Sequence, residues 1–208
     1  MALLTAPENL FLANSGEDRS CRASLWRRLT TDADWFVELV GREAKPGPAG
    51  YNAFLALSHC PRVPGQRDDG TVDGAALTAF VDRVLERTRG TELDWHASRA
   101  LARLLVRAPA DPDGRWPCEP VAALLDREDL QMVQHEFLAE YRNAQDWREI
   151  RAAAREDREK AQGFAISARA WSNRYPRTVA LLHALARVLQ SQSVSWADDA
   201  KRQTEGLY

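Results

Sequence analysis

The adjacent residues His135 and Glu136 begin a pattern that could bind zinc. In zinc proteases the pattern H-E-x-x-H places two histidines one turn apart on one helix face, so that both reach the same ion. The residue at the second histidine position is Ala139 here, so that ligand is missing. We therefore interpret His135 as a half-buried helix histidine, and the sequence predicts no metal and no other cofactor.

Two acidic turns share some features with calcium-binding loops. An EF-hand loop places carboxylates at its first and twelfth positions and glycine at its sixth. With Gly114 at the sixth position, the first and twelfth are Pro109 and Pro120. With Gly70 at the sixth, the twelfth is Ala76. Both segments are more typical of turns in which an aspartate accepts a hydrogen bond from nearby backbone and glycine supplies a positive φ.

The chain lacks the patterns of the common nucleophilic and nucleotide-binding sites. It holds no G-x-S-x-G, no G-x-x-x-x-G-K and no G-x-G-x-x-G. His59 and Cys60 could form a thiolate pair, but adjacent side chains on a helix diverge. A small buried cysteine beside Pro61 is the better interpretation. The sequence therefore indicates no catalytic residue.

Charge and cysteine content limit the classes of binding partner and of cellular compartment that we expect. The 30 acidic residues outnumber the 28 Lys and Arg residues, and the net charge is −2. A protein that coats nucleic acid normally shows a basic excess instead. Three cysteines without a C-x-x-C pattern favour a reducing compartment. Because the first residues form no secretory leader and no run of about 18 apolar residues occurs, we expect a cytoplasmic protein without a membrane segment.

Apolar residues recur at helical spacing along the chain, and no stretch alternates for long enough to form a strand. The clearest stripe follows Asp73, a typical N-cap, and consists of Leu77, Phe80, Val81, Val84 and Leu85. The sequence therefore predicts an all-α fold, a multi-helix orthogonal bundle of about eight to ten helices with no significant sheet. The expected helices are 21–29, 32–44 with Thr31 as its N-cap, 51–59, one from Asp73, one from Asp94, one around 121–125, one from 128, one over 157–173 that the charged, helix-favouring segment 142–160 overlaps, 177–191 and 195–205.

Residues 108–117 form a long turn rich in proline and glycine. Because proline cannot continue a helix and glycine relaxes the chain, this turn is the best candidate for a subdomain boundary. We expect a flexible N-terminal segment, 1–20, followed by helical subdomains 21–107 and 118–208 that together form one compact domain.

Seven tryptophans are the one excess in the composition. Trp35 and Trp171 fit apolar helix patterns and are expected in the core, whereas Trp116 and Trp147 lie among polar or turn residues. A rigid aromatic residue beside arginine is enriched at the energetic centres of protein interfaces, so we expect Trp116 or Trp147 to contact a partner. The candidate contact residues are Trp116, Arg142, Asn143, Trp147, Arg148, Tyr175 and Arg177.

Three stretches, 25–40, 111–117 and 171–182, share their order and spacing with a known group of sequences. Together they resemble the C-terminal helical region of large uncharacterised bacterial proteins, some of which carry nucleotide-binding modules like those of defence or signalling proteins. The resemblance implies an all-α fold within a larger system, and it brings no catalytic residue. Where it implies Asn-(Ala/Ser)-Arg-Gly after Tyr141, this chain has Arg-Asn-Ala-Gln over 142–145.

These observations favour a helical protein-interaction module of a bacterial signalling or defence-like system, with a protein partner or a second copy of the chain as its ligand. A second hypothesis is a nucleic-acid-associated regulator that uses the arginine-rich helix 142–160. Its arginines alternate with acidic residues, so ion pairs between residues four apart are the better explanation, and we expect no nucleic-acid partner. A third hypothesis is an enzyme with an unfamiliar site around Glu136, Tyr141, Arg142 and Asn143.

Overall fold

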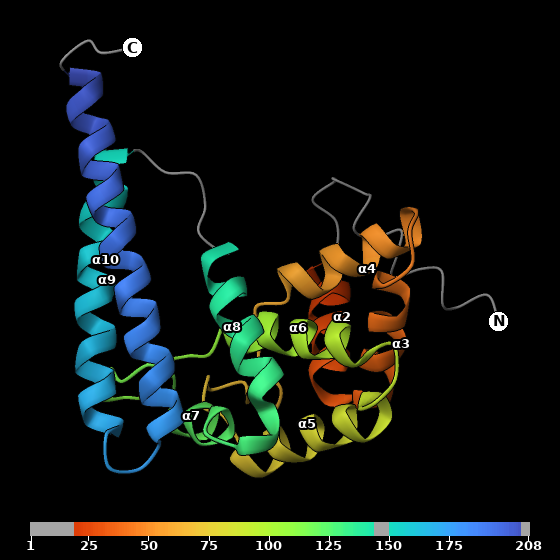
Figure 1. Ribbon diagram of the computed structural model, residues 1–208. Helices are drawn as coiled ribbons and strands as arrows, with labels where there is room; N and C mark the ends of the chain where they lie inside the picture. The colour runs from red at the N-terminus through yellow and green to blue at the C-terminus, as the bar shows by residue number, and fades with distance from the viewer. Residues whose placement is uncertain (1–18, 144–149, 205–208) are drawn as a thin grey trace. The chain divides into compact units, whose positions relative to one another are not determined.

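The computed structural model describes the backbone over residues 19–143 and 150–204 and the side chains over 23–142 and 156–194. Within these residues the chain forms nine α-helices and one 3₁₀ turn and has no strand (Figure 1). The predicted all-α fold is confirmed. The chain divides into two compact units, unit 1 ending at Pro109 and unit 2 beginning at Ala110.

Unit 1 is built around one central helix, α3. Its helices are α2 (Arg19–Thr31), α3 (Ala33–Glu43), α4 (Pro48–His59), α5 (Gly74–Thr88) and α6 (Asp94–Leu105). α3 contacts all four others, because its large apolar residues cover more than one of its faces. Trp35, Phe36 and Val40 are buried there, and the Phe36 ring meets Phe80 of α5 edge-on with 5.4 Å between the centroids.

Aspartate caps decide where two helices of unit 1 begin. Asp73 accepts two backbone N–H donors of the first turn of α5, at 3.0 and 3.1 Å, as predicted. Before α3 the cap is Asp32, whose carboxylate accepts the Trp35 backbone N–H at 3.0 Å, so the prediction of Thr31 as the cap is wrong. Thr31 belongs to the last turn of α2, because its hydroxyl donates to the Arg27 carbonyl at 2.9 Å.

Unit 2 consists of three shorter helical elements and a long helical hairpin. The elements are α7 (Glu119–Leu125), the 3₁₀ turn η1 (Glu128–Leu130), α8 (Gln131–Asn143), α9 (Ile150–Trp171) and α10 (Pro176–Thr204). α9 and α10 lie side by side, joined by residues 172–175 (Figure 1). Phe164 and Ala168 of α9 and Leu182, Leu185 and Leu189 of α10 are buried, as the helical spacing of these apolar residues requires.

The helices of the hairpin are longer than predicted. The expected segments 177–191 and 195–205 are one continuous helix, α10, and the expected helix 157–173 is the second part of α9. No glycine or proline interrupts residues 190–195. The Ser193 hydroxyl donates to the Gln190 carbonyl at 2.8 Å, so this serine is satisfied without ending the helix.

The segment after α7 caps the start of α10. The first N–H groups of a helix have no partner within it. The Asp126 carboxylate accepts the backbone N–H groups of Arg177 and Thr178, at 2.5 and 3.3 Å. The Thr178 hydroxyl also donates to the Ala122 carbonyl of α7, at 2.6 Å. These bonds fix the register of the hairpin relative to α7.

Candidate functional site

α4 buries its small residues and leaves two aromatic residues outside. Gly50, Ala53 and Ala56 are buried in unit 1. Tyr51 and Phe54 of the same helix are 60% and 38% exposed. Their rings are stacked, with 6.4 Å between the centroids and 24° between the planes. The helix therefore presents an aromatic pair on the surface of unit 1.

Close backbone packing fixes the position of this pair. A Cβ atom on Gly50 would lie 2.0 Å from the carbonyl oxygen of Lys45 and 3.1 Å from that of Arg42. Any larger residue would push the first turn of α4 away from the turn that precedes it. The placement of Tyr51, the next residue, therefore depends on the glycine.

Arg103 connects α6 to the aromatic pair. Its guanidinium carbon lies 4.9 Å from the centroid of the Phe54 ring, and its Nη1 donates to the Glu43 carboxylate at 3.0 Å. The Arg103 side chain is 4% exposed and that of Glu43 is 13% exposed. Because so little water screens it, this ion pair is stronger than a pair on the open surface. It holds the arginine against one face of the Phe54 ring.

A third exposed aromatic residue lies at the start of α6. Trp95 is 44% exposed, and the guanidinium carbon of Arg99, one turn further along, lies 5.5 Å from its ring centroid. His96 meets the Trp95 ring edge-on, with 4.8 Å between the centroids. Positions 95, 99 and 103 recur every four residues and so follow one side of the helix. Two arginines therefore lie in a row between Trp95 and Phe54.

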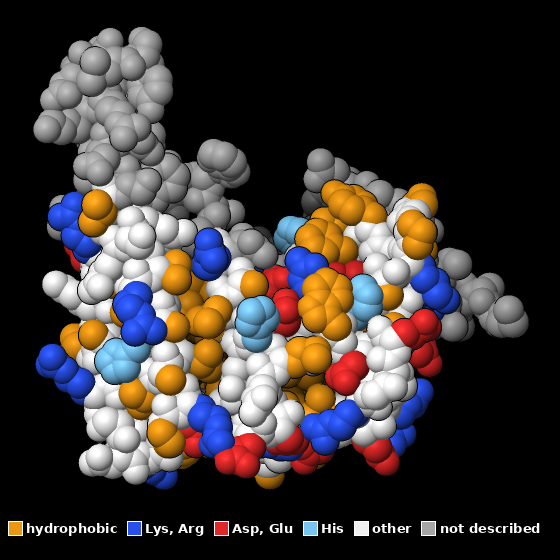
Figure 2. Space-filling view, viewed as in Figure 1, with side chains coloured by type: hydrophobic (Ala, Val, Ile, Leu, Met, Phe, Trp, Pro, Cys, Tyr) orange, Lys and Arg blue, Asp and Glu red, His pale blue; other side chains and the backbone are white. Residues whose placement is uncertain are grey.

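We call Tyr51, Phe54, Trp95, Arg99 and Arg103 the aromatic–arginine face. Figure 2 shows hydrophobic side chains gathered over α4 and α6, with basic, acidic and histidine side chains among them. Single exposed apolar residues are common on protein surfaces, whereas a group of them marks a contact site. Aromatic rings contribute to binding when a partner buries them. The arrangement is therefore suited to recognition.

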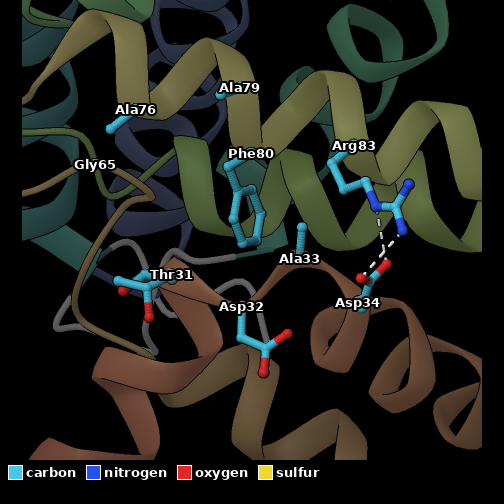
Figure 3. A pocket seen from close by; sticks show the side chains of 10 residues that line it. Thr31, Asp32, Ala33, Asp34, Gly65, Ala76, Ala79, Phe80 and Arg83 are labelled. Atoms are coloured by element: carbon cyan, nitrogen blue, oxygen red, sulfur yellow. Dashed lines mark hydrogen bonds and ion pairs between the residues drawn. The ribbon is translucent and has the colours of Figure 1, made fainter.

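A pocket of about 490 Å³ lies elsewhere in unit 1, between the α2–α3 junction and α5. Figure 3 shows Thr31, Asp32 and Asp34 on one side and Phe80 and Arg83 on the other, with Arg83 directed toward Asp34. The aromatic ring forms part of the pocket wall, and the charged groups lie toward one end. What the pocket could bind therefore depends on whether these charged side chains are paired with one another.

The charged groups at this pocket are engaged with one another. Arg83 donates twice to the Asp34 carboxylate, at 3.0 and 3.2 Å, and Arg87 donates to it at 2.7 Å. The hydrogen bonds from Arg83 hold the pKa of Asp34 below its ordinary value of 3.8. The carboxylate is therefore ionised near neutral pH. Its geometry is suited to fastening α3 to α5 and not to proton transfer.

Trp116, the first predicted contact residue, packs in an aromatic cluster of unit 2. Its ring centroid lies 5.0 Å from that of Phe164 and 5.8 Å from those of Phe137 and Tyr141. Its backbone N–H donates to the Ser167 hydroxyl at 3.1 Å. Trp116 is half-buried. The structure therefore places Trp116 among rings that come from helices distant in sequence. Its contact role stays a prediction.

Two further predicted contact residues hold the hairpin to α7. The Tyr175 hydroxyl donates to the Glu119 carboxylate at 3.1 Å, and burial together with this carboxylate raises the pKa of Tyr175. The Arg177 guanidinium donates to the Asp126 carbonyl at 3.2 Å and to the Glu128 carboxylate. Both side chains thus have structural partners within unit 2.

The other predicted contact residues lie at or beyond the end of α8. Arg142 is exposed in its last turn. Asn143 is the last residue of α8, and its side chain lies outside the described residues. Trp147 and Arg148 also lie outside the described residues. The segment 142–160 on which the nucleic-acid hypothesis depends is therefore described only in part.

The residues considered for catalysis lie in different environments. Glu136 is buried, whereas its neighbour His135 is exposed, so the predicted half-burial of that histidine is wrong. Tyr141 packs against Phe164, with 5.3 Å between the ring centroids. Over the part of the chain that the structure describes, no three His, Cys, Asp or Glu side chains are arranged to hold a metal ion.

The buried cysteines agree with the interpretation of Cys60 as a packing residue. Cys60 and Cys118 are both buried, and burial raises the pKa of each thiol to about 11. A thiol with so high a pKa is almost entirely protonated near neutral pH and is therefore a weak nucleophile.

The aromatic–arginine face was missed by the sequence analysis. The sequence predicts a helix over 51–59 without singling out Tyr51 and Phe54, and it assigns no role to Trp95. The available signal was the spacing of Gly50, Ala53 and Ala56, because small residues three apart favour close packing of that side of a helix. Such packing leaves the larger neighbours outside.

No family model, no curated protein and no solved structure matches this sequence. Within residues 19–143 and 150–204, no helix combines the length and the apolar character needed to cross a membrane.

Proposed function

We propose that this chain is a protein-interaction module and that the aromatic–arginine face is its contact surface. One observation carries the proposal. Tyr51, Phe54 and Trp95 are 60%, 38% and 44% exposed on two helices that pack against each other in one unit. Three large rings left in water are costly for an isolated protein, and a partner that covers them removes that cost.

The rings supply part of the free energy of binding. Burial of a large apolar side chain contributes about 1.5–3 kcal/mol relative to full exposure, and these rings are about half exposed. Three such rings therefore supply several kcal/mol in favourable cases, before the cost of association. Aromatic residues and arginine are also the types most often found at interface hot spots.

The face is also ordered before a partner arrives. Gly50 fixes the first turn of α4, and the Arg103–Glu43 ion pair holds one face of the Phe54 ring. A partner then loses less affinity to the ordering of side chains on this surface. The rigid rings have few rotatable bonds, which reduces that cost further.

The signalling or defence-like setting is part of the same proposal, and the resemblance of segments 25–40, 111–117 and 171–182 is its support. A second copy of the chain is one partner of the kind that the face could bind. The oligomeric state, measured by size-exclusion chromatography with light scattering, distinguishes self-association from binding to another protein.

Site-specific photo-crosslinking tests the contact surface. The photoreactive residue benzoylphenylalanine replaces Tyr51 in the full chain, expressed in the cells that contain its gene. A matched variant carries it in place of Ile166, an apolar residue of α9 that is 65% exposed and lies in unit 2. We expect irradiation to produce a defined protein adduct at position 51 and none, or far less, at position 166.

Two results would contradict the proposal. One is the absence of any protein adduct at position 51 when the variant is folded and abundant. The other is an equal yield of the same adducts at both positions, since that pattern reports collision with exposed apolar residues in general.

A further inference from the structure

We infer that the pocket between the α2–α3 junction and α5 binds a small uncharged molecule that has an aromatic ring and a hydrogen-bond donor. This site is separate from the aromatic–arginine face, so its ligand is tested independently of the proposed function. The size of the pocket, its apolar wall and the hydrogen bonds that its polar side chains already make together select such a ligand.

The pocket has the size and the apolar wall of a small-molecule site. Its volume of about 490 Å³ lies within the range of about 300–1,000 Å³ that is typical of such sites. Ala76, Ala79 and Phe80 of α5 form one wall (Figure 3). The Phe80 ring is 6% exposed and meets the Phe36 ring edge-on, so its position is fixed by the core. A ligand ring beside it gains more than burial alone provides, because the charge distributions of two aromatic rings attract each other.

Small exposed residues keep this wall accessible. Ala76 and Ala79 are exposed on α5, and the side chain of each ends at its Cβ atom. Further along the helix the exposed positions include Arg83 and Glu86, which are charged. The apolar wall is therefore confined to the first half of α5, and a ligand can reach it from solvent without a change in the backbone.

The polar side chains at the end of α2 offer acceptors to the pocket. The Thr30 hydroxyl donates to the Trp26 carbonyl, and the Thr31 hydroxyl donates to the Arg27 carbonyl, both at 2.9 Å. A hydroxyl group has one donor and two acceptor lone pairs, so each threonine that lines the pocket has used its donor and can still accept. These side chains can therefore receive a hydrogen bond from a ligand.

The charged groups of the pocket already have partners of opposite charge. Each nitrogen of the Arg83 guanidinium donates to a carboxylate, Nε and Nη2 to Asp34 at 3.0 and 3.2 Å and Nη1 to Glu86 at 2.7 Å. The Asp32 carboxylate lies 3.3 Å from the Arg28 guanidinium. A charged ligand would lose its water here without gaining an unpaired counter-ion, whereas an uncharged ligand leaves these pairs intact.

The ligand that fits both walls joins an aromatic ring to an N–H or O–H group, as in an indole or a phenol. A ring without a donor would cover the Thr30 and Thr31 hydroxyls and leave them without water or a new partner. A ligand whose polar atoms only accept would meet hydroxyl oxygens that have no hydrogen atom left to donate to it.

Four related compounds test the chemistry of the ligand. The full chain, labelled with ¹⁵N, is titrated with indole, 1-methylindole, tryptamine and indole-3-acetate, and the amide signals are followed by NMR. We expect indole to shift the signals of Ala33 and Ala79 to saturation and 1-methylindole, which lacks the donor, to bind about three- to tenfold more weakly. We expect neither charged compound to bind more tightly than indole. The absence of saturable shifts, equal binding of the two neutral compounds, or tighter binding of a charged one overturns the inference.

A pair of leucine substitutions on α5 tests the location of the site. Ala79→Leu fills the pocket from its wall, whereas Ala75→Leu adds the same side chain at an exposed position that does not line the pocket. We expect Ala79→Leu to abolish indole binding and Ala75→Leu to leave it unchanged. Binding that survives Ala79→Leu, or that both variants weaken equally, overturns the inference. Circular dichroism shows whether each variant is folded, and if Ala79→Leu is not, Ala76→Leu takes its place in the same comparison.

Discussion

Arginine has two different uses at the residue scale in unit 1. Arg83 and Arg87 hold the Asp34 carboxylate at the surface, where water and salt screen the attraction and each pair contributes little. Arg103 lies in a nearly buried place between Glu43 and the Phe54 ring. The first arrangement fastens two helices, and the second orders a surface that a partner can recognise.

The Asp34 network gives stability a defined dependence on pH. Because the pKa of Asp34 is lower in the folded chain than its ordinary value of 3.8, its contribution is fully present above that value. It is lost as the pH falls through the lower pKa of the folded state. We expect Asp34→Asn to cost stability near neutral pH and the difference from wild type to shrink below about pH 4. Urea unfolding of both proteins over this range measures it, and a difference that stays constant with pH contradicts the account.

Local residue interactions were predictable from the sequence. Asp73 caps α5, and Asp69 accepts the Thr71 backbone N–H at 2.9 Å in the turn where Gly70 has a φ of 88°. These bonds join residues two or three positions apart, so the sequence contains both partners. The environment of His135 was predicted incorrectly, because exposure depends on elements that come from distant parts of the chain.

At the scale of elements, the fit of α4 against its neighbours carries the site. Small residues on its buried side allow close packing, and the aromatic residues are left outside. The buried side of α4 also holds Leu57, which is completely buried, so α4 contributes to the core while its two aromatic residues remain at the surface.

Two glycine substitutions test this packing. Gly50→Ala would place a Cβ 2.0 Å from a carbonyl oxygen, and we expect a loss of about 1–3 kcal/mol in the free energy of unfolding. Gly163→Ala in α9 is the matched control, because no atom lies within 4 Å of its Cβ position. There we expect a gain of about 0.5–1 kcal/mol from helix propensity. Urea unfolding measures both, and equal effects would contradict the account of α4.

The cap of α10 gives a second prediction for elements. Asp126→Ala removes the acceptor for the first N–H groups of α10, and we expect a loss of about 0.5–2 kcal/mol in stability. Asp113→Ala is the control, because its side chain is 75% exposed and its loss should change stability by less than about 0.5 kcal/mol. Thermal unfolding of the two variants compares them. A destabilisation by Asp126→Ala no larger than that of the control contradicts the capping role.

Element type was predictable, whereas element length was less so. The predicted stripe of α5 contains five of its six buried residues, and Thr88 is the sixth, because one face of that helix packs and the other is solvated. α10 was divided into two predicted helices, since residues 190–195 carry serine and glutamine and few apolar residues. These polar residues weaken the apolar pattern without ending the helix, so the pattern alone placed a boundary that the backbone does not have.

At the scale of the whole molecule, the chain divides between Pro109 and Ala110, within the turn 108–117. The all-α class followed from composition and periodicity, which average over many residues. The proposed contact surface could not be predicted in this way, because the exposure of Tyr51 or Trp95 is a property of a packed unit. A helical sequence fixes which residues recur on one side, but the packing partners decide which side is buried.

The affinity of the full chain for a peptide recovered from a random library on the wild-type chain alone is the most direct test of the central claim. Titration calorimetry compares the wild type with the double variant Tyr51→Ala/Phe54→Ala and with Ile166→Ala. We predict that the double variant binds about tenfold more weakly or worse, with a thermal unfolding midpoint within about 4 °C of the wild type, and that Ile166→Ala changes neither. A folded double variant that binds the peptide as tightly as the wild type would contradict the account.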